Sequence, residues 1–221
     1  MSTPSSASSP RRRFLKDPVS GLTHLAGCGL GAFGAVFLVA RGGRDGPSRS
    51  ALVVYGLCLV ALYAASASYH LIDVAGAWSR RLRLLDHIAI FFMVAGTCTP
   101  IFYRAFSGRE RVWMLGGIWT VALAGAAFKL LWRSAPRPLY TAIYLAMGWG
   151  VVMRWPTVSA AIPLPALGLV VAGGVTYSLG ALVYALKRPD PFPRSFGFHE
   201  IWHLFVLAGS GLHYAAIAAL R

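Results

Sequence analysis

Carboxylate side chains are scarce in this sequence. Its 221 residues include only seven Asp and Glu against 21 Lys and Arg, which gives a formal net charge of +14. Charged residues make up 13% of the chain and hydrophobic residues 57%, whereas soluble domains average about 25% charged. This composition excludes a disordered chain. The basic residues lie between long apolar runs, so a soluble nucleic-acid-binding protein is excluded too, and membrane lipids are the expected partners.

Cysteine is also rare. Cys28, Cys58 and Cys98 are odd in number, form no CxxC motif and all fall inside apolar runs. A secreted scaffold held by disulfides needs paired cysteines at regular spacing, so that class is excluded. We interpret the three thiols as small packing residues.

Long apolar runs dominate the chain and are separated by basic or Pro/Gly-containing loops. A helix needs about 20 residues to cross about 30 Å of hydrocarbon, and seven runs approach that length. They are continuous rather than alternating, so helices are favoured over β-barrel strands. The sequence therefore predicts an all-α, polytopic membrane protein, a seven-transmembrane-helix bundle with spans near 20–40, 51–72, 84–104, 112–132, 138–155, 164–186 and 197–219.

Domain organisation and orientation follow from the same pattern. We expect a disordered basic cytoplasmic tail over 1–18 and a single membrane domain over 19–221. Pro100 and Pro156 are expected where the third and fifth spans end. Thirteen Lys and Arg fall on the same side of the membrane as the N-terminus and eight on the opposite side, which favours a cytoplasmic N-terminus. The Arg-, Ala- and Gly-rich chain suggests a bacterial inner membrane.

Ionisable side chains inside the expected spans are the main functional signal, because each is costly in lipid without a partner or a purpose. His70 lies near the end of the second span, Asp86 near the start of the third, and His199, Glu200 and His203 at the start of the seventh. A rise of about 1.5 Å per residue places all five within roughly 10 Å of one membrane face.

The spacing of these residues predicts a zinc site. His199 and His203 are four residues apart, so their side chains share one helix face, and Ser66 and His70 repeat that spacing. Three neutral imidazoles with an open fourth position suit zinc that keeps a water for chemistry. Asp86 would then hydrogen-bond that water or a ligand histidine, and Ser66 would add a hydroxyl.

Other readings of these residues stay open. The string HEIWH matches the HExxH motif, in which the glutamate is a general base, but we favour Glu200 as a structural partner for a loop arginine or His24. His24 is either a fourth ligand or, as we favour, a hydrogen-bond partner. His87 is expected at the interface, and His213 about 21 Å along the last helix from His199, outside the site.

With these residues in view, the sequence resembles the hemolysin III branch of the progestin and adipoQ receptor family, which includes the adiponectin receptors. The resemblance covers almost the whole chain and rests on the segments SASYH, LDHIAIFFMVAGTCTP, PRPLYTAIYLAMGW, GGVTYSLGALVYALKRP and FHEIWHLFVLAGSGLHY. It implies seven helices, a zinc ion held by His70, His199 and His203, and Asp86 beside a zinc-bound water.

The opening element departs from the family pattern of Glu, Asn and His. This chain has Asp17, Ser20 and His24 instead, so we expect packing alone from the first two.

Three functions fit the sequence. The resemblance implies a zinc-dependent, ceramidase-like hydrolase of a lipid amide or ester, with Asp86 as general base and Ser66 as a hydrogen-bond donor. The alternatives are a pore-forming, cytolytic hemolysin and a non-catalytic lipid sensor whose zinc is structural.

Overall fold

The computed structural model describes residues 15–42, 45–192 and 195–220, and nearly all of these are helical. Most of the expected tail, residues 1–14, lies outside the described residues. The described chain forms α1 (Pro18–Arg41), α2 (Gly46–Leu71), α3 (Gly76–Ala105), α4 (Gly108–Leu131), α5 (Arg137–Trp149), the 3-10 helix η1 (Gly150–Arg154), α6 (Trp155–Ala161), α7 (Leu164–Leu186) and α8 (Phe198–Ala218).

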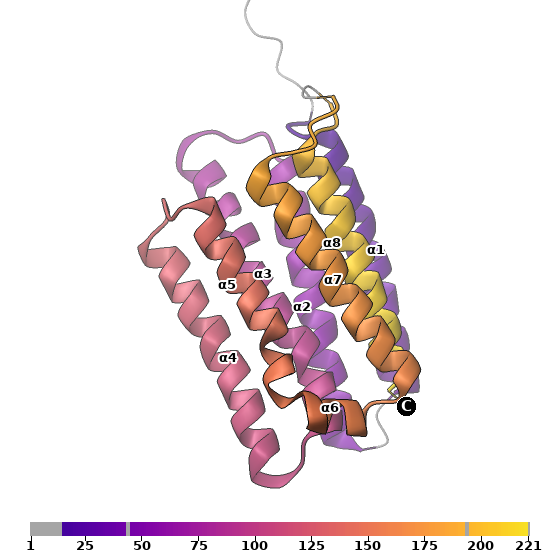
Figure 1. The fold of residues 1–221 in the computed structure, drawn as a ribbon. Coiled ribbons are helices and arrows are strands. Elements are labelled where there is room, and N and C mark those ends of the chain that lie inside the picture. The colour runs from indigo at the N-terminus through magenta and orange to yellow at the C-terminus, as the bar shows by residue number, and fades with distance from the viewer. Residues whose placement is uncertain (1–14, 43–44, 193–194, 221) are drawn as a thin grey trace, which may run out of the picture.

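The long helices stand side by side in one bundle (Figure 1). Short connections make successive helices antiparallel neighbours, with α1 against α2, α2 against α3, α3 against α4 and α7 against α8, while α8 also contacts α1. The starts of α1, α3, α5 and α8 therefore share one end of the bundle with the ends of α2, α4 and α7 (Figure 1). We call this the N-terminal end.

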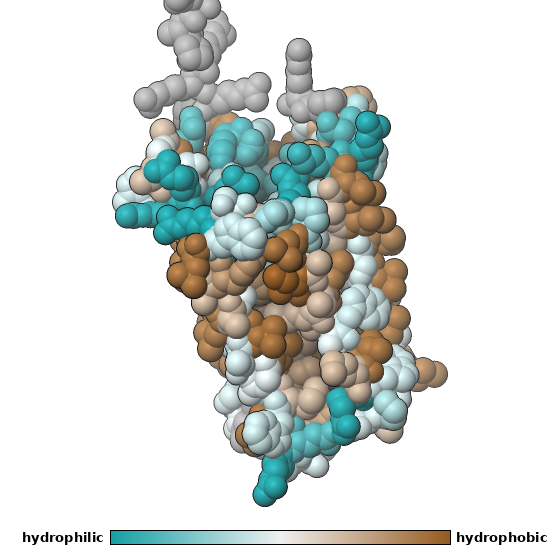
Figure 2. Space-filling view, turned by 60° about the vertical axis from the view of Figure 1, so that its left-hand side comes forward, coloured by the Kyte–Doolittle hydropathy of each residue, from teal (hydrophilic) through white to brown (hydrophobic). Residues whose placement is uncertain are grey.

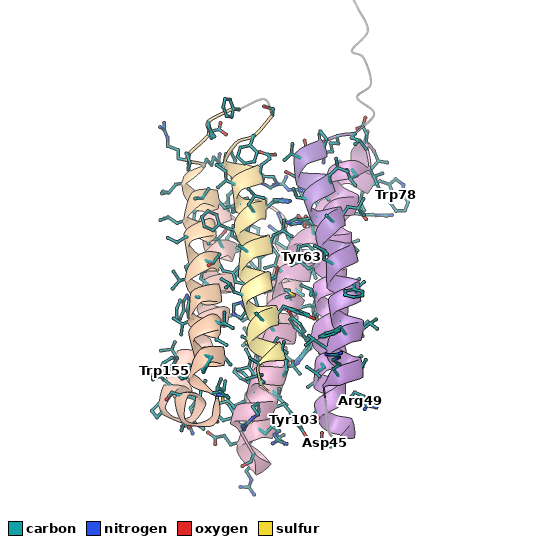
Figure 3. All side chains as sticks on the ribbon, turned by 90° about the vertical axis from the view of Figure 1, so that its right-hand side faces the viewer. Asp45, Arg49, Tyr63, Trp78, Tyr103 and Trp155 are labelled. Carbon is teal, nitrogen blue, oxygen red and sulfur yellow. The ribbon has the colours of Figure 1, made fainter. Side chains whose placement is uncertain are left out.

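The surface of the bundle matches a lipid environment. Six helices in the described chain are long and apolar enough to cross a membrane, and an apolar belt separates two hydrophilic ends (Figure 2). Large apolar side chains on α1 point outward, such as Leu30 and Phe33, which are 73% and 74% exposed. Trp78 and Trp155 lie near opposite ends (Figure 3), as interfacial tryptophans do. The predicted helical, polytopic membrane bundle is confirmed.

The third helix is longer than the span predicted over 84–104. It begins at Gly76, and its 30 residues correspond to about 45 Å, more than the roughly 30 Å of hydrocarbon. The prediction started late because hydropathy detects only the part of a helix that lies in lipid. Pro100 lies inside α3 and is buried, so its expected place at a helix end was wrong. Neighbouring helices make such an interior proline tolerable in a membrane bundle.

The fifth predicted span, 138–155, is built from two pieces. Helix α5 ends at Trp149 after 13 residues and continues as η1 to Arg154. Together the two pieces are about 30 Å long, which is enough to reach the other end. Pro156 lies just past the end of this segment, as expected, in the first turn of α6, where its missing N–H costs nothing.

Candidate metal centre

Three imidazole rings from α2 and α8 meet at the N-terminal end of the bundle. His70 is the penultimate residue of α2, His199 is the second residue of α8, and His203 follows one turn later. The Nε2 atom of His199 lies 3.3 Å from Nε2 of His70 and 3.2 Å from Nε2 of His203. One ligand atom from each residue lies within 4.8 Å of the others.

These separations fit a single metal ion. Two nitrogens bound tetrahedrally to zinc at 2.0–2.1 Å are about 3.3 Å apart, which matches the two Nε2 separations. His70 and His203 are only 2% and 3% exposed, and the buried Nδ1 of His203 has no hydrogen-bond partner among the described residues. Imidazole nitrogens suit zinc and other borderline divalent ions. The three histidines can therefore hold such an ion.

Asp17 orients the first of these rings. Its Oδ2 lies 3.1 Å from Nδ1 of His70, and its backbone N–H donates to the carbonyl oxygen of His70 at 2.9 Å. A proton on Nδ1, shared with the carboxylate, leaves the lone pair on Nε2, which faces the other two rings. The expectation that Asp17 serves packing alone was wrong.

Glu200 is held by two hydrogen bonds. The hydroxyl of Ser20 donates to Oε1 at 2.9 Å, and the backbone N–H of Gly197 donates to Oε2 at 2.8 Å, which caps the start of α8. Glu200 thus ties α8 to α1, and both of its oxygens are engaged. A structural role was expected, but its partners are Ser20 and Gly197 rather than a loop arginine or His24.

His24 stacks on a ligand ring instead of making the expected hydrogen bond. Its ring centroid lies 3.9 Å from that of His203, with an angle of 29° between the planes. Within the described chain, both of its buried nitrogens lack a hydrogen-bond partner. His24 therefore packs against the ligand cluster and limits how His203 can turn.

The two remaining histidines do not belong to the group of three ligands, although both line the same cavity. His87 is buried, only 8% exposed, with its ring 5.2 Å from that of Tyr140, so its expected interfacial position was wrong. His213 lies ten residues beyond His203 on α8, and its Nδ1 contacts the carbonyl oxygen of Gly209 at 2.9 Å.

Ser66 and Asp86 line the same cavity as the three histidines. The cavity measures about 500 Å³. The Ser66 hydroxyl interacts with the Asp86 carboxylate, and the positive charges of Arg83 and Lys16 act on that carboxylate. Away from the histidines the walls are largely apolar and come from α2, α3, α5 and α7, including Leu62, Val94, Leu145 and Val170. The cavity thus combines a polar end with an apolar chamber, as binding sites for small amphipathic molecules do.

A helical spacing in the sequence could have pointed to Asp17 and Ser20. Asp17, Ser20 and His24 follow one another at intervals of three and four residues, which places them on one face of α1. The positions at i, i+3 and i+7 indicate that this face turns toward the site.

Comparisons with known proteins agree with this architecture. A family model described as "Haemolysin-III related" matches residues 12–214. "Hemolysin-3" of Bacillus cereus is 29% identical over 208 residues, covering 93% of this chain and 92% of that protein. "Heptahelical transmembrane protein ADIPOR2" of rice is 33% identical over 198 residues, covering 81% and 85%. Human "Monocyte to macrophage differentiation factor" is 26% identical over 168 residues, covering 74% and 67%.

Proposed function

The chain belongs to the haemolysin-III-related family, within the hemolysin III branch of the progestin and adipoQ receptor family, and from this premise we propose that it is a zinc-dependent intramembrane hydrolase of a lipid amide or ester. One observation carries the proposal: three imidazoles, two buried and one partly buried, lie with converging Nε2 atoms in the wall of a cavity that also contains a carboxylate.

The donor set supports zinc as the ion. His70, His199 and His203 are three nitrogen ligands, and three protein ligands are typical of catalytic rather than closed structural zinc sites. When bound, zinc supplies a Lewis acid that polarises a carbonyl group and makes water a stronger nucleophile at neutral pH.

Asp86 supplies the acid–base function in this proposal. Its carboxylate takes a proton from the attacking water and later returns it to the leaving nitrogen or oxygen. Ser66 holds the carboxylate through its hydroxyl, since the two side chains interact. A positioned general base of this kind contributes roughly 10²–10⁴-fold to a rate.

The apolar part of the cavity supports a lipid as the substrate. Its volume of about 500 Å³ lies within the range of small-molecule sites. Side chains such as Leu62, Val94 and Val170 would contact an acyl chain while the polar linkage reaches the histidine end. The walls would also keep bulk water away from the reacting bond.

Hydrolysis assays on purified protein test the proposal. Zinc-loaded wild type is incubated with fluorescent ceramide and with an acyl ester lipid, and the released fatty acid is measured beside the bound zinc. Asp86→Asn should keep zinc and lose at least about a hundredfold in rate, whereas His203→Ala should lose zinc and activity together. Zinc-loaded wild type that releases no product from any of these lipids would refute a hydrolase and favour a lipid sensor with structural zinc.

Lysis of red cells tests the activity that the name of the Bacillus cereus relative indicates. Wild type and His203→Ala are compared at equal amounts of membrane-inserted protein. Equal lysis by both would favour a cytolytic role that needs no zinc.

A further inference from the structure

A second cavity lies at the N-terminal end of the bundle, outside the histidine cluster. It measures about 530 Å³ and is formed by the end of α4, the start of α5, the end of α7 and the beginning of α3. Five of its lining residues are basic and none is acidic; the basic ones are Arg83, Lys129, Arg133, Arg137 and Lys187. We call this cavity the basic pocket.

Lys129 is the unusual member of the basic pocket. It is only 3% exposed, its Nζ lies 3.5 Å from the carbonyl oxygen of Arg133, and the ammonium sits 4.0 Å from the ring centroid of Tyr140. Across residues 15–42, 45–192 and 195–220, the only ion pairs are His70 with Asp17 and Arg154 with Glu110. A buried ammonium without a carboxylate is unfavourable, so the position of Lys129 favours binding of an anion.

The other cations are held near Lys129 despite mutual repulsion. The charge of Arg83 acts on Lys129. Arg137 is placed by aromatic rings: its guanidinium lies 4.5 Å from the ring centroid of Tyr184, and Nη1 donates to the Tyr184 carbonyl oxygen at 3.5 Å. Arg83 also acts on the carboxylate of Asp86, but Asp86 lines the metal cavity and not the basic pocket. Negative charge is therefore in deficit on the pocket side.

We propose that the basic pocket binds a phosphate group, as the headgroup of an anionic lipid or as free phosphate. Arginine guanidinium groups bind phosphate through paired hydrogen bonds, and lysine adds a compact charge. The pocket lies at an end of the bundle where hydrophilic side chains replace the apolar belt, on the α4 and α5 side (Figure 2). In a bilayer, the lipid headgroups lie where the hydrocarbon core ends.

The basic pocket adjoins the metal cavity. Arg83, Arg137 and Tyr140 line both, so a bound phosphate would lie beside the histidine end. The pocket does not depend on the metal, because the three ligand histidines are absent from its lining. Phosphate binding and hydrolysis can therefore be tested separately.

Basic residues that only orient the protein in the membrane would not need to be grouped around one pocket. Basic residues that orient a membrane protein need only lie outside its apolar spans, and the exposed Arg80, near the start of α3, is of that kind. Lys129 belongs instead to the last turn of α4 and is buried. The burial of Lys129 therefore favours a binding site over a set of basic residues that serves only to orient the protein in the membrane.

Thermal unfolding in detergent at constant ionic strength tests the proposal. Three probes are titrated into the purified full chain: dioleoyl phosphatidic acid, dioleoylglycerol and inorganic phosphate. The two lipids share their acyl chains and differ in the phosphate. We expect a saturable rise in Tm with phosphatidic acid and none with dioleoylglycerol. A rise with inorganic phosphate at lower concentrations than phosphatidic acid requires would identify the free ion as the ligand.

Two variants and a matched control assign the effect to the pocket. Lys129→Met removes the buried charge while keeping the length of the side chain, so the protein without ligand should be at least as stable as wild type. Its apparent Kd for phosphatidic acid should rise about tenfold or more, as expected when a charged hydrogen bond is lost. Arg133→Gln, at an exposed position, should weaken binding in the same direction, and Arg80→Gln should leave it unchanged.

Two results would overturn the proposal. One is an equal response to phosphatidic acid and dioleoylglycerol with none to phosphate. The other is the same loss of affinity in Lys129→Met and Arg80→Gln, which would indicate nonspecific attraction to positive charge. Repeating the titration with His203→Ala, where we expect the same Kd, keeps the outcome independent of the proposed hydrolase.

Discussion

Replacement of Asp17 by asparagine is expected to weaken zinc binding, although this side chain lies outside the three ligands. The Asp17 carboxylate accepts a hydrogen bond from Nδ1 of His70 at 3.1 Å, which sets the ring so that Nε2 faces the metal position. Removing such a partner costs about 10- to 100-fold in metal affinity. The Asp17 side chain is 45% exposed, so solvent screens part of the interaction and we expect the lower limit, about tenfold or 1.4 kcal/mol.

Competition with a fluorescent zinc chelator measures this change in the detergent-solubilised protein. Asp73→Asn is the matched control, because it makes the same charge change at an exposed position three residues after His70. Thermal unfolding without metal shows whether either variant alters the fold. An Asp17→Asn protein that binds zinc as tightly as Asp73→Asn and wild type would refute the assignment of Asp17 as the residue that orients His70.

Three further predictions concern packing, pH and orientation. Gly125→Ala should lower the stability of the bundle by about 1–3 kcal/mol, because the added methyl group meets the fully buried ring of Phe91. Gly117→Ala on the same helix is the control, since its methyl group meets nothing within 4 Å. Equal Tm values for the two variants would contradict the predicted steric clash. Zinc affinity should be level at neutral pH and fall only in acid, because the free imidazoles take up protons that the metal-bound ones cannot. Chelator competition from neutral pH down to the lowest pH at which the protein stays folded checks the sign. An affinity that stays constant over that whole range would exclude histidine ligands. Alkaline phosphatase fused to the C-terminus should be active in a bacterial host, and the same enzyme fused to the N-terminus should be inactive. The reason is that thirteen basic residues on the side of the N-terminus against eight on the other predict a cytoplasmic N-terminus, and seven crossings then place the C-terminus outside. The reverse pattern of activity would invert the proposed topology.

Hydropathy alone was sufficient to predict most helices of the membrane bundle, but it predicted the residues at which they begin and end less well. The start of α3 was missed because Arg80, Arg81 and Arg83 are helical outside the apolar run. The fifth segment was read as one span because hydropathy does not distinguish α5 from the 3-10 turn that continues it.

The candidate site was predictable where its spacing is local and unpredictable where it depends on packing between helices. His199 and His203 share a helix face because four residues make about one helical turn, and this spacing can be read from the sequence. Asp17, which contacts His70, and Ser20, which donates to Glu200, come from the start of α1, 53 and 180 residues away along the chain. A local sequence pattern does not show which residues so far apart along the chain will be in contact.

The sequence by itself determined that this chain is a helical membrane protein with imidazoles at one end, because transfer into lipid depends on each segment's own composition. Only the tertiary structure decided that Asp17 orients His70, that Ser20 ties α1 to α8, and that cations from α3, α4, α5 and α7 surround one pocket. Those contacts arise from how the helices pack against each other, and packing is a property of the whole bundle.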